Sequence, residues 1–475
     1  MSGEIRHLKD MIKELPETDC SRIHQECINA IKNTHRRVVV LDDDPTGTQA
    51  VHDIPEITQW DAGHIHSMFE APYSMFFILT NSRAVSARES ARIHREIANR
   101  LIDEIKKTGQ DILLISRSDS TLRGHYPLET AVINEEWLHA DRAGFDAEII
   151  VPFFPEGGRY TIGDVHYAEL DEKMIPAAET EYAKDRTFPY SKSNLCEWIE
   201  EKTHGSFLAK DVCSFSVEEL RKESSAHLEE KLMGVTGFGK ILVNAVSYTD
   251  LELFVIPLMG AIQRGKRFLF RSAASLTKIL GIVSDRELLR KDELTDAGND
   301  HGGLIVAGSH VQKTTAQLKK LCECHPIEKL EFDVQSVPDP EKLAELRHSL
   351  PRRIDLLLEE KKNVLLYTSR KRFDTQSGGE ADLLFSTKVS EALSEIVGRI
   401  TVRPRFILAK GGITSSDIAT KSLQIKQAMV TGQILKGVPV WKAGKESKFP
   451  GIPYIIFPGN VGDTDALKEA YDKLL

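Results

Sequence analysis

Short apolar runs that end in polar turns alternate with helical patterns along most of this chain. Each run is about five residues long and apolar throughout, without the polar–apolar alternation of a strand that faces water on one side. Strands of this kind are buried on both faces, as in a parallel sheet covered by helices. The runs in the first part of the chain read RVVVLDDD, MFFILTNSR, DILLISRSDST, EIIVPFFP, GKILVNAVSYTD and KRFLFRSAAS. The sequence therefore predicts an α/β fold with mostly parallel sheets.

The alternation lapses over a polar stretch, RKDELTDAGNDHGG, and then resumes. A chain of 475 residues is too long for one ordinary core. We predict a first domain over residues 1–290, a linker over 291–302 and a second domain over 303–475, with a ligand cleft between the domains. Apolar residues at helical spacing within residues 1–36 predict one or two helices before the first strand.

Composition narrows the classes of function. With 41% hydrophobic and 28% charged residues, the chain has the make-up of a soluble globular protein. Its net charge of −9 argues against nucleic acid as a binding partner and favours small molecules. We expect no signal peptide and no membrane span, and the six cysteines form no disulfide framework, so a cytoplasmic location is expected. The oligomeric state is open, a homo-oligomer included. The segment CECH, residues 322–325, lacks a second ligand pair and is interpreted as a solvated helix end.

Three consecutive aspartates, Asp42, Asp43 and Asp44, follow the first predicted strand. Extended geometry would place Asp42 and Asp44 on one side and Asp43 on the other. Two like charges roughly 7 Å apart repel by about 2 kcal/mol at an effective dielectric near 20, so a partly buried cluster needs cations or shared protons. A solvated turn is the structural alternative.

Matching cations follow two other predicted strands. Arg83 lies in LTNSRAVS, and Arg117, Asp119 and Arg123 lie in SRSDSTLRGHYPLE. Arginine forks suit planar carboxylates, and aspartates accept hydrogen bonds from sugar hydroxyls. A small polyhydroxy acid would use both residue types, although structural ion pairs would produce a similar pattern.

The second domain carries three glycine-containing turns between a strand and a helix. They are the Gly308–Ser309 turn, the turn at Gly411 and Gly412, and the turn that begins at Gly459. In the second turn, Thr414 and Asp417 have capping-box spacing. Glycine lets the backbone approach a phosphate, so three such turns indicate a nucleotide site, although tight turns use glycine in any case. Neither the P-loop pattern nor the Rossmann glycine pattern occurs.

The aspartates also fit a rival chemistry. An apolar strand followed by D-x-D-x-T, with FFILTN further on, is similar to haloacid-dehalogenase-type phosphatases. That resemblance implies Asp42 as nucleophile, Asp44 as its acid/base partner and Thr80 as a phosphate contact. The late acidic motif of that family has its nearest counterpart in GDTD, residues 462–465, beyond the predicted domain boundary. The phosphatase interpretation leaves the second domain unused.

Several longer motifs together resemble the four-carbon acid sugar kinase family. They are LDDDPTGTQAVHDIP, LTNSRA, SRSDSTLRGHYPLE, GGITSSDIATK, GQILKGVPVW and FPGNVGDTDAL, and they cover the chain from about residue 37 to its end. The resemblance implies an ATP-dependent kinase that phosphorylates a terminal hydroxyl of threonate, erythronate, 3-oxo-tetronate or a related acid, with ATP and Mg²⁺ as cofactors. The segment before residue 37 and a long middle region with a Gly157–Gly158 turn depart from shorter family members. The middle region is interpreted either as a flap over the substrate or as a surface insertion.

The matching motifs also imply site residues. On the sugar-acid side they place Asp42, Asp43, Asp44, Thr46, Arg83, Arg117, Asp119 and Arg123. On the ATP side they place Ser309, Gly411, Gly412, Ile413, Thr414 and Gly459. Asp43 or Asp119 is the expected catalytic base, with Asp463 as a third candidate. The metal ligands stay unassigned.

Overall fold

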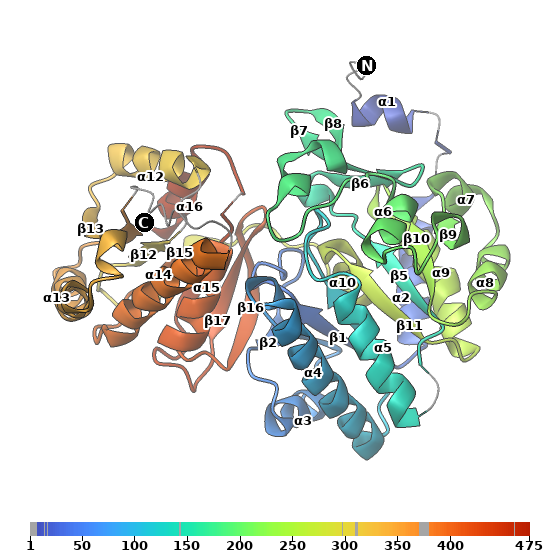
Figure 1. Cartoon of the computed structure of the whole chain (residues 1–475), viewed down its shortest axis with the longest axis horizontal. Helices are drawn as coiled ribbons and strands as arrows, with labels where there is room; N and C mark the ends of the chain where they lie inside the picture. The colour runs from blue at the N-terminus through green and yellow to red at the C-terminus, as the bar shows by residue number, and fades with distance from the viewer. Residues whose placement is uncertain are drawn as a thin grey trace. The chain divides into compact units, whose positions relative to one another are not determined.

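The computed structural model describes residues 7–13, 15–16, 18–141, 144–296, 298–308, 312–369, 380–459 and 461–475. The chain forms two compact units (Figure 1). The first unit contains residues 1–43 and 60–284, and the second contains residues 44–59 and 285–475. An early segment of the chain, including the last of the three aspartates, therefore belongs to the second unit.

The first unit is built on a parallel sheet with the strand order β3-β1-β4-β11-β5-β10-β9. A smaller antiparallel sheet has the order β6-β7-β8. Figure 1 shows α4 and α5 side by side along the strands, and α2 and α8 pack on α9. The strands are β1 (Arg37–Asp42), β3 (Met75–Leu79), β4 (Ile112–Arg117), β5 (Ala147–Val151), β6 (Arg159–Ile162), β7 (Val165–Leu170), β8 (Lys173–Pro176), β9 (Cys213–Phe215), β10 (Gly239–Val243) and β11 (Phe268–Ser272). The helices are α1 (Leu8–Ile12), α2 (Cys20–Lys32), α3 (Ala62–Glu70), α4 (Ala87–Thr108), α5 (Leu128–Asp141), α6 (Leu195–Lys202), α7 (Val217–Lys222), α8 (Ser225–Met233), α9 (Tyr248–Gln263) and α10 (Ala274–Leu280).

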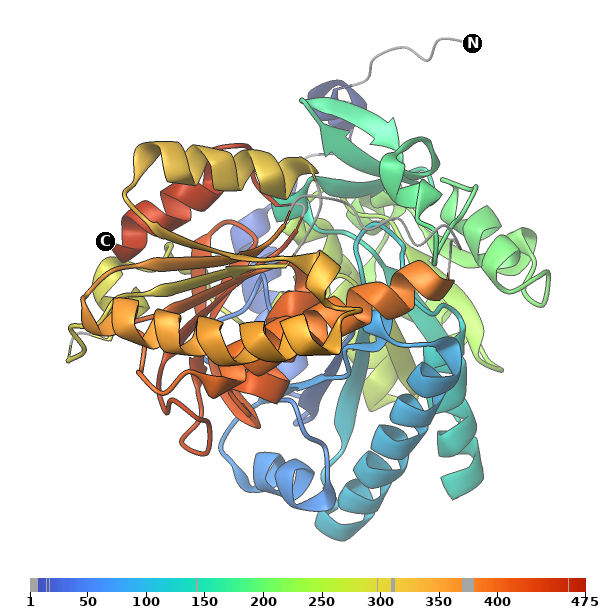
Figure 2. The ribbon, with the colours of Figure 1, turned by 60° about the vertical axis from the view of Figure 1, so that its left-hand side comes forward.

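The second unit has a mixed sheet with the order β13-β14-β12-β15-β18-β17-β16-β2. Its first five strands are parallel, and its last three join by antiparallel pairs. In Figure 2, α12 and α16 cover one face of this sheet and α13 and α14 cover the other. The strands are β2 (Ile54–Ile57), β12 (Leu304–Ala307), β13 (Glu328–Phe332), β14 (Val364–Thr368), β15 (Ile407–Lys410), β16 (Gln427–Leu435), β17 (Val438–Ala443) and β18 (Pro453–Phe457). The helices are α11 (Lys291–Leu294), α12 (Gln312–Cys324), α13 (Pro340–Glu359), α14 (Glu380–Arg399), α15 (Gly412–Asp417) and α16 (Ala466–Leu474).

The burial of the strands explains why they appear in the sequence as continuous apolar runs. Every residue of β3 is buried, as expected for a parallel strand with helices on both faces. By contrast, β16 alternates buried and half-buried residues, which is typical of an antiparallel strand with one face toward solvent. The predicted α/β class with mostly parallel sheets is confirmed, and so are the helices before the first strand. The β2 segment joins the second unit because it pairs with β16, far away in sequence.

A buried ion pair lies next to a cluster of aromatic side chains in the first unit. The Lys240 Nζ lies 2.6 Å from the Glu148 Oε2, and both side chains are almost fully buried. The hydroxyl of Tyr126 also donates to this carboxylate, at 3.4 Å. Tyr126 in turn stacks on Trp198, with ring centroids 4.6 Å apart. The Glu148 carboxylate therefore depends on Lys240 for charge compensation.

Removing Lys240 alone should destabilise the first unit strongly. We expect Lys240→Met to lower the free energy of unfolding by about 3–5 kcal/mol, because it leaves a buried carboxylate without its cation. Adding Glu148→Gln to this variant removes the uncompensated charge and keeps an acceptor for Tyr126. The double variant should therefore regain most of the lost free energy of unfolding. Urea denaturation followed by intrinsic fluorescence measures both effects. A double variant no more stable than Lys240→Met would contradict this account.

Candidate active site

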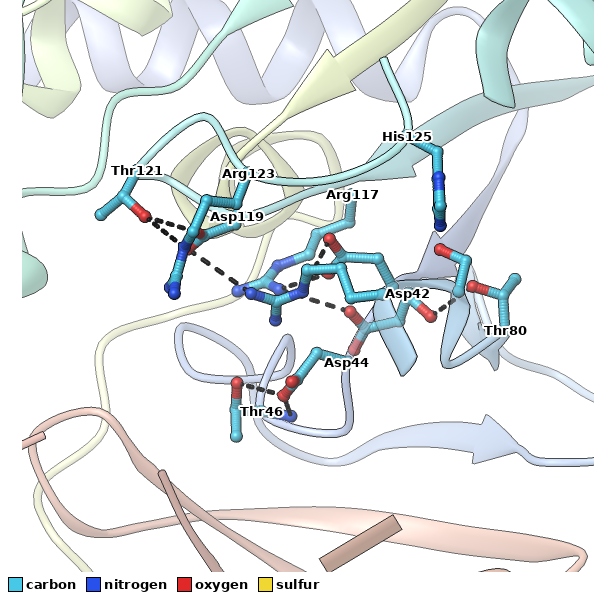
Figure 3. Close-up of polar contacts among 12 residues, drawn as sticks. Asp42, Asp44, Thr46, Thr80, Arg117, Asp119, Thr121, Arg123 and His125 are labelled. Atoms are coloured by element: carbon cyan, nitrogen blue, oxygen red, sulfur yellow. Dashed lines mark hydrogen bonds and ion pairs between the residues drawn. The ribbon is translucent and has the colours of Figure 1, made fainter. Parts of the chain in front are cut away.

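Two neighbouring strands of the first unit end in residues of opposite charge. Asp42 at the end of β1 is in register with Arg117 at the end of β4. The Arg117 Nη1 donates to the Asp43 Oδ1 at 3.1 Å and lies 3.5 Å from the Asp42 Oδ1 (Figure 3). Asp42 is 0% exposed and Asp43 is 2% exposed. The cations that the buried aspartates require are therefore present, and a parallel sheet brings them to the same edge.

The turn after β3 holds the end of β1 in place. The Thr80 N–H and hydroxyl both donate to the Asp42 backbone carbonyl at 2.8 Å. The N–H of Asn81 donates to the same oxygen at 3.3 Å. Asn81 has a φ of +50°, which turns the chain away from the strand direction. Thr80 is thus a structural partner of the Asp42 backbone.

Arg83, which follows this turn, connects two aspartates. Its Nε lies 3.1 Å from the Asp43 Oδ2, and its Nη1 lies 3.7 Å from the Asp119 Oδ1. Its backbone N–H also donates to the Asp43 carbonyl, at 3.4 Å. Arg83 therefore joins the acidic ends of β1 and β4 into one network.

Asp119 is held by several donors from its own loop. The Arg123 Nε donates to the Asp119 Oδ2 at 2.6 Å, and the Thr121 hydroxyl donates to the same oxygen. Burial would raise the pKa of Asp119, but the charges of Arg123 and Arg83 and these hydrogen bonds outweigh it and hold the pKa well below its usual range. Asp119 is thus an ionised carboxylate that accepts hydrogen bonds. The Arg123 Nη1 also lies 3.7 Å from the Asp185 Oδ2.

The long middle region contacts this loop. The ring of Tyr182 lies near two guanidinium groups, with the Arg123 Cζ 5.4 Å and the Arg159 Cζ 5.2 Å from its centroid. The Tyr190 hydroxyl donates to the Thr121 carbonyl at 2.9 Å. The region is therefore packed against the Asp119 loop.

The sequence reasoning missed Arg271, near the end of β11. This strand is the neighbour of β4, and Arg271 is 3% exposed. Its Cζ lies 4.8 Å from the Tyr126 ring centroid, and its Nη1 lies 3.5 Å from the Glu129 Oε2. The signal was present in the sequence, because FLFRS is an apolar run that ends in Arg-Ser, as does LLISRS at Arg117.

Asp44 is assigned to the second unit, whereas Asp42 and Asp43 are assigned to the first. The strand β1 ends at Asp42, so extended alternation does not continue as far as Asp44. The Asp44 Oδ1 accepts from the Thr46 N–H at 2.9 Å and from the Thr46 hydroxyl at 2.6 Å. A Cβ added to Gly412 would lie 2.6 Å from the Asp44 Oδ2. Within this unit, the Asp44 carboxylate thus lies at one of the glycine turns and would have to move if Gly412 carried a side chain.

The three glycine turns of the second unit follow adjacent parallel strands. Lys410, the last residue of β15, is in register with Ala307 of β12 on one side and Phe457 of β18 on the other. A Cβ added to Gly308 would lie 2.3 Å from the Thr414 Oγ1. Gly308 therefore lies directly beside α15, and the strands that precede the three turns are neighbours in the sheet.

The individual predicted ATP contacts lie as follows. Gly411 has a φ of +111°, which favours glycine, and its N–H donates to the Phe457 carbonyl at 2.9 Å. Ile413 is 46% exposed. Gly459 follows β18 directly after Pro458. Ser309 lies outside the described residues.

The capping box predicted from Thr414 and Asp417 is wrong. Gly411 is the N-cap residue of α15, and no side chain caps this helix. Asp417 instead accepts a hydrogen bond from the Ser390 hydroxyl at 2.6 Å. The spacing was correct for a capping box, but the helix begins earlier because the glycine pair forms the turn.

Lys410 is a second residue that the sequence reasoning missed. It is 0% exposed, and its ammonium donates to the Pro458 carbonyl at 3.0 Å and lies 4.1 Å from the Phe457 ring centroid. Burial, with a smaller effect from the charge of Lys313, lowers the pKa of Lys410 to about 7. A lysine with a pKa near neutrality is therefore placed among the three glycine turns.

No dedicated metal site is evident in the described part of the chain, where no group of three histidine, cysteine or acidic side chains could hold an ion. In the CECH segment the His325 Nε2 lies 2.7 Å from the Asp472 carboxylate, and Cys324 is exposed. Asp44 and Thr46 offer the oxygen ligands that Mg²⁺ prefers, and Mg²⁺ commonly binds through one or two carboxylates together with substrate phosphates. The residues present therefore fit a metal that arrives with a nucleotide.

Comparison with known proteins assigns the two parts of the chain. Residues 38–280 match the sugar-binding N-terminal domain, and residues 304–467 match the nucleotide-binding C-terminal domain. The chain belongs to the four-carbon acid sugar kinase family. The strand-end aspartates and arginines of β1 and β4 therefore lie in the sugar-binding domain of this family member, and the glycine turns from Gly308 to Gly459 lie in its nucleotide-binding domain.

Solved structures share the fold of this family member. A DUF1537 protein from Haemophilus influenzae is 17% identical, with 92% of this chain and 100% of that chain covered and a TM-score of 0.59. A Salmonella typhimurium protein described provisionally as a tRNA synthase is 16% identical, with a TM-score of 0.63. The match covers 93% of this chain and 99% of that chain. No curated protein sequence matches. Among the described helices, none combines the length and the apolar character needed to span a bilayer.

The lowered pKa of Lys410 predicts a pH-dependent stability. Above pH 7 and below the ordinary lysine pKa, the unfolded chain holds a proton here that the folded protein lacks, so raising the pH favours the folded state. The titration of Lys410 can change the free energy of unfolding by at most about 1.4 kcal/mol per pH unit. We expect the free energy of unfolding of the wild type, relative to Lys410→Met, to rise between pH 7 and 9.5, as measured by urea denaturation. The exposed Lys445→Met is the matched control, and parallel curves for wild type and Lys410→Met would refute the assignment.

Proposed function

We propose that this family member is an ATP-dependent kinase that phosphorylates a terminal hydroxyl of a small sugar acid such as threonate, erythronate or 3-oxo-tetronate. The observation that carries the proposal is the buried arginine–aspartate network at the strand ends of the sugar-binding domain. Its carboxylates can accept hydrogen bonds from hydroxyl groups, and arginines lie within hydrogen-bond distance of them and balance their charge. Six free thiols support the proposed cytoplasmic location.

In this proposal, Asp43 and Asp119 orient the accepting hydroxyl. Phosphoryl transfer depends mainly on positioning and charge neutralisation, so a strong base is not required. Asp119 has a depressed pKa and is a weak proton acceptor, so it serves as an orienting group. We favour Asp43 as the group that takes the hydroxyl proton. Asp463 is exposed, and its Oδ1 accepts from the Asp465 N–H at 3.0 Å, which fits a local turn.

On the nucleotide side, the glycine turns at Gly411–Gly412 and Gly459 give the backbone room to approach phosphates. We propose Ser309, Ile413 and Thr414 as further ATP contacts. When bound, Mg²⁺-ATP supplies the phosphoryl group and the metal neutralises part of its charge. Asp44 and Thr46 would hold the metal, because the Asp44 carboxylate lies at the Gly412 turn and the Thr46 hydroxyl contacts it.

The phosphatase alternative fits the local geometry less well. It needs Asp42 as an accessible nucleophile, yet Asp42 is 0% exposed and lies 3.5 Å from the Arg117 Nη1. It also needs Thr80 to contact a phosphate, but the Thr80 hydroxyl donates to the Asp42 carbonyl. The kinase is therefore the better-supported function.

A substrate panel tests the proposal directly. The protein is incubated with ATP, Mg²⁺ and each of threonate, erythronate and 3-oxo-tetronate in both stereochemical series, and acid-dependent ADP release is recorded. Phosphorus NMR of the product identifies the phosphorylated hydroxyl. We expect ADP release with at least one acid. Hydrolysis of small phosphate esters through a trappable phosphate on Asp42, without acid-dependent ADP release, would establish the phosphatase instead.

Replacing Arg117 should weaken substrate binding. Hydrogen bonds to charged groups contribute about 1.5–3 kcal/mol, so we expect Arg117→Ala to raise the KM of the acid about 10- to 100-fold. Arg117 orders Asp42 and Asp43, and its loss leaves their carboxylates without this donor. Steady-state kinetics give the value, and circular dichroism checks folding. Arg95→Ala, which removes an exposed ion pair with Glu136, is the control; an Arg117→Ala KM equal to that of the control would exclude Arg117 from the acid site.

A further inference from the structure

Arg271 occupies a central place in the sheet of the sugar-binding domain. It lies on β11 between β4 and β5, in register with Ser116 and Ile150. It is 3% exposed. Its strand ends at the same edge as β1 and β4, which carry the aspartates and Arg117. Arg271 is thus a buried cation at the carboxyl edge of the sheet, where α/β domains bind their ligands.

The hydrogen-bonding groups of this guanidinium are not used within the described chain. Neither Nη1 nor Nη2 of Arg271 has a hydrogen-bond partner there, although both atoms are buried. The Nη1 lies 3.5 Å from the Glu129 Oε2, which compensates the charge without a hydrogen bond. The other carboxylate oxygen of Glu129 accepts from the hydroxyls of Ser82 and Ser90, at 2.5 and 3.3 Å. Buried donors without acceptors are costly, which favours a ligand that supplies them.

Three neighbouring arginines differ from Arg271 in that their ion-pair partners are aspartates. Arg83, Arg117 and Arg123 each approach an aspartate within 3.1 Å. Their charges are therefore matched inside the network that orders Asp43 and Asp119. Arg271 has no aspartate partner among the described residues, and its donors are the ones that a substrate anion can use.

The position of Gly124 shows where these donors face. A Cβ added to Gly124 would lie 3.5 Å from the Arg271 Nη2 and 3.8 Å from the Asp43 Oδ2. A single point beside the Gly124 backbone is thus close to both a guanidinium donor and a carboxylate acceptor. A sugar acid has both complementary groups, a carboxylate for the donor and a hydroxyl for the acceptor.

An aromatic stack holds the guanidinium in place. The Arg271 Cζ lies 4.8 Å from the Tyr126 ring centroid, and Trp198 stacks on the same ring at an interplanar angle of 19°. Cation–π contact with a buried ring fixes a guanidinium without using its N–H groups. The fork of Arg271 is therefore ordered in advance of ligand binding.

We propose that Arg271 is the residue that binds the carboxylate of the sugar acid and so sets the preference for acids over neutral sugars. This inference rests on the proposed sugar-acid kinase function and adds which group recognises the acid. A guanidinium fork binds a planar carboxylate through two parallel hydrogen bonds, which a neutral hydroxymethyl group cannot accept in the same way. Arg83, Arg117 and Arg123 then serve to order the aspartates that accept from the hydroxyls.

The test compares each acid with its neutral counterpart. Wild type, Arg271→Met and Arg271→Lys are assayed with ATP and Mg²⁺ on erythronate and erythritol, and on threonate and threitol. Loss of charged hydrogen bonds predicts that Arg271→Met lowers kcat/KM for the acid about 10- to 100-fold, chiefly through KM, while the value for the polyol changes little. Arg271→Lys keeps the charge but loses the fork, so its preference for the acid should be intermediate. Arg264→Met, an exposed arginine paired with Glu229 and Glu230, should behave as wild type.

Binding without turnover separates this inference from the proposed function. Acid-induced thermal stabilisation is measured for the same proteins without ATP. If the wild type binds an acid but transfers no phosphoryl group, and Arg271→Met abolishes that binding, the kinase proposal fails and the inference stands. If either folded Arg271 variant keeps the wild-type preference for acid over polyol, the inference is overturned while the kinase proposal stands. A wild type that neither binds nor phosphorylates any acid overturns both.

Discussion

Two carboxylates at the end of β1 can be buried because arginines from neighbouring strand ends compensate them. Arg117 contacts both Asp42 and Asp43, and Arg83 extends the network to Asp119. An isolated buried carboxylate would be protonated or would destabilise the fold, since burial disfavours the charged form. The parallel sheet supplies the compensation, because it brings the carboxyl ends of β1, β3 and β4 to one edge. The recognition chemistry of the sugar-binding domain depends on this arrangement.

The network also separates two tasks that arginines can have in such a site. Arginines paired with aspartates keep those aspartates ionised and oriented, so that their remaining lone pairs can accept from hydroxyl groups. An arginine whose donors are unused, such as Arg271, can contact the substrate anion itself. The nucleotide-binding domain uses a different means, in which glycines at Gly308 and Gly412 leave space that the side chains of Thr414 and Asp44 approach closely. Asp44 takes part in that second arrangement although it directly follows Asp43 in the chain.

Much of the fold could be predicted from the sequence, because the relevant signals are local. Apolar runs such as those of β1 and β3 reflect burial on both faces, and helical spacing before residue 37 reflects one apolar side. Site residues that follow a predicted strand, such as Arg117, could be found in the same way. The capping box at Thr414 was wrong, since spacing alone does not say where a helix begins. Arg271 and Lys410 were missed because they lie at the ends of apolar strands, where a solvent-facing side chain is the ordinary interpretation.

The sequence by itself determined the α/β class, the helices at the start of the chain, and the residue types that the two domains present at their strand ends. Only the tertiary structure decided which of these residues act together. Strand order makes β11 the neighbour of β4 and places β15 between β12 and β18, and no local pattern encodes that order. Pairing of β2 with β16 likewise draws residues 44–59, with Asp44, into the second unit. Long-range pairing and burial decide which charges are matched, because compensation depends on distance in space and not on distance along the chain.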